Sequence, residues 1–331
     1  MRALVIADQQ LVVETRPDPE PQAGEVLVRV AGAGLNRADL AQRSGFYPAP
    51  PGVPADIPGL EFSGDVLALG SGVDTLDVGD RVFGLVGGGG QAELLTVPAA
   101  HCVRVPDILD LVAAGGVPEV FITAHDAMVT QATLEPGEVV LVHAAGSGVG
   151  TAAIQLAHAM GCTVVGTSRT PEKLEQCRAL GLDHAIVAPR DLDAIALAEE
   201  IAAAAGPIHV TIDLVGGDYL VTNVRAAARL GRIVMVASQA GSRAELEIGL
   251  MMGKRLRVHG TMLRARDKAE KAAATEAFAR DVVPLLADGR VAPVVARTFP
   301  LDRASEAYDL LAADAVFGKI VLDLTERTST S

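Results

Sequence analysis

Short stretches of alternating apolar and polar residues mark the first third of the chain. Residues 27–30 read Leu-Val-Arg-Val, the pattern of a half-buried strand. Similar short strands are expected at 65–69, 81–85 and 93–97, with glycine and proline in the turns between them. Such a series predicts a β-rich sandwich or barrel rather than strand–helix–strand units.

Two segments of this region predict loops. Residues 46–58 contain five prolines and should form a stiff loop. Residues 87–90 are a run of four glycines, which predicts a flexible hinge or turn because glycine tolerates conformations that other residues avoid.

From residue 139 onward, apolar strands alternate with helices. Residues 139–142 read Val-Val-Leu-Val, the continuous apolar run of a buried parallel strand. This rhythm predicts a doubly wound parallel sheet. The expected strands are 139–143, 163–167, 185–187, 210–214, 233–236 and 256–261, and the expected helices are 148–160, 171–180, 191–205 and 219–228. A helical segment ending near residue 289, and a helix and a strand within 300–324, complete the chain.

The fold class is therefore α/β, with a doubly wound, Rossmann-type domain and a second, β-rich domain. The change of pattern near residue 120 divides the chain. We assign 121–266 to the dinucleotide-binding domain, and 1–120 together with 267–331 to the β-rich domain.

Composition narrows the class of partner. Half of the 331 residues are hydrophobic and 21% are charged, which favours sizeable cores and argues against extensive disorder. The net charge of -13, without a basic run, disfavours nucleic acid. No apolar run reaches the roughly 18 residues of a membrane span, and an acid at residue 8 comes too early for a secretory signal. We expect a soluble, cytoplasmic protein.

A glycine-rich turn joins the strand at 139–143 to the next helix. Gly146, Ser147, Gly148, Val149 and Gly150 form this turn, in which glycine allows the backbone to approach a pyrophosphate closely. The spacing departs from G-x-G-x-x-G, so the strand–turn–helix context carries the prediction. A glycine turn required only for packing is the alternative.

The end of the second strand of this domain predicts which nicotinamide cofactor binds. An NAD site carries an acid there, whereas this chain has Thr167, Ser168 and Arg169, with Lys173 one helical turn later. Hydroxyls and cations suit a 2′-phosphate, which favours NADPH. A solvated pair of charges at a helix start is the alternative.

Several sequence blocks, in order, resemble the medium-chain dehydrogenase/reductase superfamily over residues 1 to about 324. They are similar to its zinc-free, zeta-crystallin-like quinone oxidoreductase branch, and most to the tumour-suppressor-inducible quinone oxidoreductases. The blocks are Leu35-Asn36-Arg37-Ala38-Asp39-Leu40, Arg43-x-Gly45-x-Tyr47, Gly59-Leu60-Glu61-x-x-Gly64, Val117-Pro118-Glu119, His143–Gly150 with Thr151–Leu156, Leu263-Arg264-x-Arg266-Asp267 and Gly318–Leu322. The resemblance implies that the β-rich domain is GroES-like.

The resemblance also implies site residues. Asn36, Asp39 and Tyr47 would line the cleft near the nicotinamide as catalytic residues, with a packing role as the alternative. Thr123 would meet the carboxamide, or pack inside a helix, and Lys319 would lie near the cofactor, or be a lone surface lysine.

Loops and one edge strand complete the expected sites. Val215 and Ser238 follow the fourth and fifth strands of the sheet, where doubly wound folds bind ligands. Arg264 and Arg266 would shape the substrate pocket, or be solvated. By resemblance, strand 256–261 would join two copies into a homodimer, since an unpaired apolar edge is a liability.

The same resemblance predicts that no metal is bound. Zinc-dependent relatives place a cysteine within the stretch that aligns with 36–39, where this chain has no thiol, and a His-Glu pair where it reads Leu60-Glu61. The three cysteines, Cys102, Cys162 and Cys177, are scattered, and no histidine pair has an i, i+4 spacing.

These inferences predict NADPH-dependent, zinc-independent reduction of quinones by hydride transfer from the nicotinamide. One alternative is an enoyl or alkenal reductase acting on an activated double bond. The other is a non-catalytic NADPH-binding protein, such as a redox sensor. The expected partner is a small quinone or enone, with neither nucleic acid nor membrane.

Overall fold

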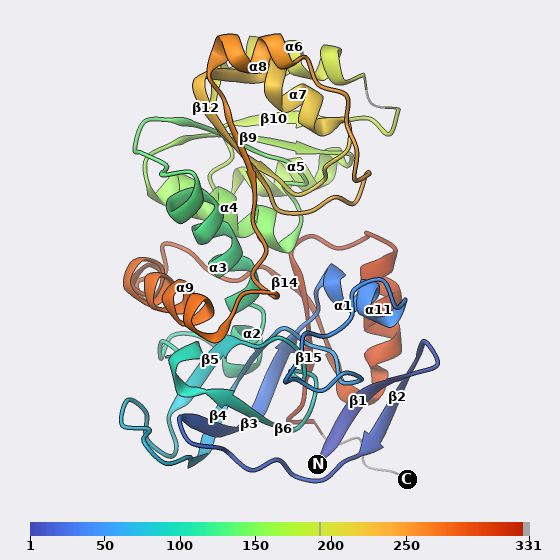
Figure 1. The fold of residues 1–331 in the computed structure, drawn as a ribbon, viewed down its shortest axis with the longest axis vertical. Coiled ribbons are helices and arrows are strands. Elements are labelled where there is room, and N and C mark those ends of the chain that lie inside the picture. The colour runs from blue at the N-terminus through green and yellow to red at the C-terminus, as the bar shows by residue number, and fades with distance from the viewer. Residues whose placement is uncertain (192, 327–331) are drawn as a thin grey trace. The chain divides into compact units, whose positions relative to one another are not determined.

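The computed structural model describes residues 1–191 and 193–326. The chain separates into two compact units, whose residues can be found in Figure 1 from the bar that gives colour by residue number. The first unit consists of Met1–Ile122 and the described part of Leu263–Ser331, and the second is Thr123–Met262. Each unit is built around its own sheet.

The first unit contains a seven-stranded sheet of order β14-β15-β3-β4-β5-β7, with β6 paired to β3. Its strands are β3 (Glu25–Gly34), β4 (Glu61–Leu69), β5 (Arg81–Leu85), β6 (Leu94–Pro98), β7 (Cys102–Arg104), β14 (Val295–Pro300) and β15 (Lys319–Asp323). Strands β1 (Arg2–Ala7) and β2 (Gln10–Thr15) form a separate hairpin (Figure 1). The helices are α1 (Arg37–Arg43), α2 (Leu111–Ala114), α9 (Lys268–Asp281), α10 (Val283–Ala287) and α11 (Ala304–Ala312), and α3 (Pro118–His125) begins in this unit and ends in the second.

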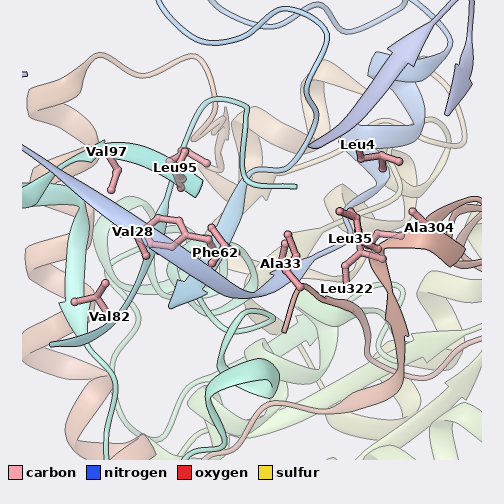
Figure 2. Packing of buried hydrophobic residues seen from close by; sticks show 14 of the residues in the cluster. Leu4, Val28, Ala33, Leu35, Phe62, Val82, Leu95, Val97, Ala304 and Leu322 are labelled. Atoms are coloured by element: carbon pink, nitrogen blue, oxygen red, sulfur yellow. The ribbon is translucent and has the colours of Figure 1, made fainter. Parts of the chain in front are cut away.

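The core of this unit comes from the inward side chains of the strands. Val28, Phe62 and Val82 are buried on β3, β4 and β5, and Leu322 on β15 joins the same cluster (Figure 2). Alternation of buried and less buried positions along β3 produces this face, as its sequence pattern predicted.

The second unit is a six-stranded parallel sheet of order β10-β9-β8-β11-β12-β13. Its strands are β8 (Val139–Val142), β9 (Thr163–Ser168), β10 (His184–Val187), β11 (Ile208–Asp213), β12 (Ala227–Met235) and β13 (Arg257–Gly260). The helices are α4 (Gly148–Ala159), α5 (Pro171–Arg178), α6 (Ala194–Ala205), α7 (Tyr219–Ala226) and α8 (Ile248–Lys254), with a π-helical turn at Asp126–Gln131. This strand order confirms the predicted doubly wound fold.

The glycine run at 87–90 differs from its expectation. All four glycines are buried, and a Cβ at Gly87 would lie 2.9 Å from Cγ of Pro50. The same atom at Gly89 would lie 3.4 Å from Cδ of Pro54. The run is therefore a close-packed surface under the proline-rich segment rather than a free hinge.

Candidate functional site

The glycine-rich turn of the second unit follows β8 and opens α4. Ser147 is the N-cap, and its Oγ accepts a hydrogen bond from the N–H of Gly150 at 3.1 Å. The N–H groups of Gly148 and Val149 have no hydrogen-bond partner among the residues that the structure describes. Because a helix N-terminus combines such N–H groups with partial positive charge, the turn fits an anionic pyrophosphate.

Two glycines of the turn are required by close contacts. A Cβ at Gly150 would lie 2.5 Å from the carbonyl oxygen of Ala144 and 2.6 Å from that of Ala145. Gly150 therefore lets α4 pack against the end of β8. A Cβ at Gly146 would lie 2.9 Å from Cβ of Lys173, so the lysine side chain passes over the turn. The packing alternative thus explains Gly150, while Gly146 brings a cationic side chain to the candidate phosphate site.

The residues after β9 lie at the same edge of the sheet as this turn, because β8 and β9 are adjacent and parallel. Ser168 Oγ accepts a hydrogen bond from the N–H of Thr170 at 3.1 Å, which fixes the entry to α5. Arg169 is exposed, and Glu172 is an exposed acid in the first turn of α5. Lys173 thus contacts the glycine turn, and Ser168 and Arg169 follow the neighbouring strand, but their binding of a 2′-phosphate stays a prediction.

A buried polar network, which sequence reasoning missed, supports these strand ends. His143 Nδ1 lies 2.7 Å from Thr167 Oγ1, and its Nε2 lies 2.6 Å from Asn223 Oδ1. Asn223 Nδ2 donates to Asp213 Oδ2 at 2.8 Å. Burial is the main cause that lowers the pKa of His143, so the ring is neutral at physiological pH. The signal was a histidine directly after an apolar strand.

The loops that carry Val215 and Ser238 are held against each other. Asp213 Oδ1 accepts hydrogen bonds from the N–H groups of Val215 and Gly216, each at 2.8 Å. A Cβ at Gly216 would lie 2.7 Å from Cα of Ser238, so only glycine allows this approach. Ser238 is exposed at the carboxyl edge of the sheet, whereas Thr123 is buried within α3.

In the first unit, Lys319 is buried and paired. Its Nζ lies 2.7 Å from Oε1 of Glu61 and donates to the carbonyl oxygen of Leu35 at 2.6 Å and to Asn36 Oδ1 at 2.8 Å. The side chains are 4% and 0% exposed for Lys319 and Glu61. The surface-lysine alternative is therefore wrong. Three protein partners occupy the ammonium, which favours a role in holding Asn36 and Glu61 over direct contact with a cofactor.

Asp39 is enclosed completely. Its carboxylate accepts hydrogen bonds from the N–H of Asn36 at 2.8 Å, from the N–H of Gly59 at 3.3 Å and from Gln91 Nε2 at 3.3 Å. Burial raises its pKa to about 6, although these N–H groups and the nearby charge of Lys319 oppose the rise. With no exposed surface, Asp39 is suited to position Asn36 and α1.

Tyr47 is half-buried beneath an arginine. The guanidinium carbon of Arg264 lies 4.7 Å from the centre of the Tyr47 ring, a cation–π geometry. Arg264 also donates to the carbonyl oxygens of Gly87 at 2.9 Å and Tyr47 at 3.0 Å, and to Gln42 Oε1 at 2.5 Å. Arg264 is thus buried, and the solvated alternative is wrong for it. The Tyr47 hydroxyl makes no hydrogen bond to any described residue.

Glu119 is an acid to which sequence reasoning gave no role. Its backbone N–H donates to Glu61 Oε2 at 2.8 Å, and the charges of Glu61 and Lys319 act on its carboxyl group. Burial, reinforced by the charge of Glu61, raises the pKa of Glu119 to about 8. Its block, Val117-Pro118-Glu119, carried the family resemblance without indicating this chemistry.

The described residues contain no second candidate functional site. Within 1–191 and 193–326, no three His, Cys, Asp or Glu side chains are grouped to hold a metal ion. None of the helices there is long and apolar enough to cross a membrane. A depression of about 540 Å³ in the first unit, bordered by Met1, Arg29, Asp65 and Leu324, contains none of the predicted site residues.

Two family models match this chain. The model described as "Alcohol dehydrogenase GroES-like domain" matches residues 22–107, and the one described as "Zinc-binding dehydrogenase" matches residues 148–279. The second name refers to zinc, but the described residues offer no ligand group for it.

Known proteins and solved structures match most of the length of this chain. A quinone oxidoreductase of Sus scrofa is 31% identical over 92% of this chain and 90% of its own length. Polyketide synthase GfsB of Streptomyces halstedii is 34% identical over 91% of this chain, which spans only 5% of that protein. The quinone oxidoreductase structure of Pseudomonas syringae matches with a TM-score of 0.84 and 28% identity over 98% of this chain and all of its own. A mycobacterial protein complexed with NADPH matches with a TM-score of 0.85 and 25% identity over 98% of this chain and all of its own.

Proposed function

We propose that this chain, which belongs to the medium-chain dehydrogenase/reductase superfamily, reduces quinones with NADPH and without a metal ion. It is an oxidoreductase of that superfamily, whose members bind nicotinamide cofactors. The choice of NADPH and of a quinone is the proposed part.

The proposal that NADPH is the cofactor rests on the residues at the start of α4 and after β9. Unpaired N–H groups at Gly148 and Val149 would bind the pyrophosphate, with Lys173 across Gly146 as a nearby cation. Arg169 would bind the 2′-phosphate, for which a guanidinium offers two parallel hydrogen bonds. The solved relative with bound NADPH supports this choice.

The first unit supports the proposal for the acceptor. Tyr47 offers a hydroxyl without a described partner, held in place by Arg264, and Asn36 is fixed by Lys319 and Glu61. When bound, the cofactor supplies the hydride, and the protein supplies orientation and a proton. Since the described residues offer no metal-ligand set, the acceptor should be one that is reactive on its own, as quinones are.

Calorimetry with NADPH and NADH tests the cofactor assignment. Replacing Arg169 by alanine removes a charge-assisted bond to the 2′-phosphate, worth about 1.5–3 kcal/mol, so NADPH affinity should fall about 10- to 100-fold. NADH affinity should change far less. Arg178→Ala is the control, because Arg178 is exposed on the same helix and pairs with Glu175. Equal losses for both nucleotides would contradict the 2′-phosphate assignment, and no binding of either would contradict the proposal.

The similarity to a segment of a polyketide synthase favours a second candidate, an enoyl or alkenal reductase on the same scaffold. Fold and cofactor site do not separate the two, because acceptor choice depends on the loops of the site. NADPH oxidation should be followed with a panel of quinones, enones and enoyl thioesters. Higher kcat/KM for the thioesters would replace the quinone proposal, and NADPH that no acceptor oxidises would favour a redox sensor.

A homodimer through strand β13 is also proposed. β13 is an edge of the sheet, and the neighbouring α8 exposes Ile248 and Met252. Paired edges and covered apolar side chains would protect both features. Light scattering should give twice the chain mass, and Met252→Glu should shift the mass toward the monomer.

A further inference from the structure

Glu119 lies among charged residues of the first unit, and its carboxyl group differs from theirs in its hydrogen bonding. Glu61 pairs with Lys319, Asp39 is bound by two backbone N–H groups, and Arg264 donates to carbonyl oxygens. Lys271, on α9, donates to the carbonyl oxygen of Arg264 at 2.8 Å. The Glu119 carboxyl makes no hydrogen bond to any residue of 1–191 or 193–326, and its residue remains partly exposed.

The surroundings of Glu119 favour its acid form. Glu61 on β4 and Asp39 on α1 are negative neighbours, and Lys319 on β15 and Arg264 are positive ones. Lys271 on α9 and the Tyr47 ring also lie within electrostatic reach of Glu119. Because Lys319 already neutralises Glu61, a second carboxylate beside this pair would be unfavourable. A pKa of about 8 means that Glu119 carries a proton at neutral pH.

We infer that Glu119 is the general acid that gives a proton to the acceptor oxygen. This inference rests on the proposed quinone reduction. The quinone takes a hydride, which is a proton and two electrons, from the dihydronicotinamide, and becomes a hydroquinone anion. The O–H bond of Glu119 breaks as a new O–H bond forms on that anion. NADPH has then been oxidised to NADP⁺, the quinone reduced to hydroquinone, and Glu119 left as a carboxylate that regains a proton from water.

Other groups of the cluster are less suited to this step. Asp39 has no exposed surface, and Glu61 is held by Lys319, Asn36 and the N–H of Glu119. The phenol of Tyr47 has a pKa raised by burial, so it can donate a hydrogen bond but is a weak proton donor. A general acid works best when its pKa lies near the operating pH. Burial brings the pKa of Asp39 and of Glu119 toward that range, but of the two only Glu119 keeps exposed surface.

The proton on Glu119 can be measured without turnover. In the unfolded chain a glutamic acid titrates near its ordinary value, so between that value and about pH 8 the folded protein binds the extra proton. Stability of the wild-type protein should therefore fall as pH rises through this window. Glu119→Gln cannot ionise, so its melting temperature relative to wild type should increase from pH 6 to pH 9. The exposed Glu20 provides the control Glu20→Gln, which should show no such trend. Parallel melting curves of Glu119→Gln and wild type at every pH would overturn the inference.

Kinetics with NADPH and a benzoquinone then test the transfer. The kcat of the wild type should fall above about pH 8, where the acid has lost its proton. Glu119→Gln should lower kcat about 100-fold or more, leave KM for the quinone nearly unchanged and remove the alkaline fall. A wild-type kcat that stays flat to pH 10, or a variant with full kcat, overturns the inference while quinone reduction stands. A wild type that binds NADPH but reduces no quinone overturns the proposed function itself, and the assignment of Glu119 with it.

Discussion

Lys319 and Glu61 form a buried ion pair, and removing either charge should destabilise the folded protein. Removing one partner of a buried ion pair leaves an uncompensated charge, which typically costs about 3–5 kcal/mol. We expect Lys319→Met to lower the free energy of unfolding by that amount, measured by urea denaturation. Glu61→Gln combined with Lys319→Met should recover part of the loss.

The exposed pair of Lys268 and Glu25 is the control for this measurement. Its atoms are 3.8 Å apart and Lys268 is 79% exposed, so Lys268→Met should cost no more than about 1 kcal/mol. Equal losses from the two lysine substitutions would contradict a structural role for the buried pair.

The contacts of single residues are the part of the structure that the sequence did not predict. Polar residues beside apolar runs could be recognised as unusual, as with His143 after β8, but their partners could not. Asn223 and Glu61 are far along the chain from His143 and Lys319, and only the folded sheets bring them together. For the same reason Lys319 could not be distinguished from a surface lysine, although its position in the family pattern was recognised.

Among the secondary-structure elements, α4 depends on the contact between Gly150 and the end of β8. An added methyl group would meet two backbone oxygens that cannot move independently. Gly150→Ala should therefore destabilise the protein by about 1–3 kcal/mol, the cost of overpacking. Gly253→Ala in α8, where a Cβ meets nothing within 4 Å, should stabilise it by up to about 1 kcal/mol. Thermal melts of both variants test the contrast, and a stabilising Gly150→Ala would refute it.

Elements were predictable where local pattern decides them. Four apolar residues followed by glycines located β8 and the start of α4 to within one residue. The boundary after α7 was placed too late, because Ala227 and Ala228 look equally helical, and β12 starts there since Ala227 pairs with Ile208. The β1–β2 hairpin has no glycine at its turn, where Asp8 and Gln9 take positive φ, so the usual turn signal was missing.

At the scale of the whole molecule, the proposed cofactor contacts are concentrated in one of the two units. Apart from Lys319, the residues predicted to bind the cofactor belong to Thr123–Met262. A ligand that binds only the folded state adds about 2.7 kcal/mol of stability at 100 times its Kd, and that gain should protect the elements it contacts.

Hydrogen exchange with and without saturating NADPH would test this distribution. Amides of residues 144–150 and 167–174 should exchange more slowly with the ligand, because the turn before α4 and the entry to α5 would hold its phosphates. Amides of the hairpin β1–β2 provide an internal control and should be unaffected, because none of the predicted site residues lies there. Slowing confined to residues 1–122, with none at 144–150, would mean that the cofactor binds elsewhere, and the assignment of the glycine turn would then have to be abandoned.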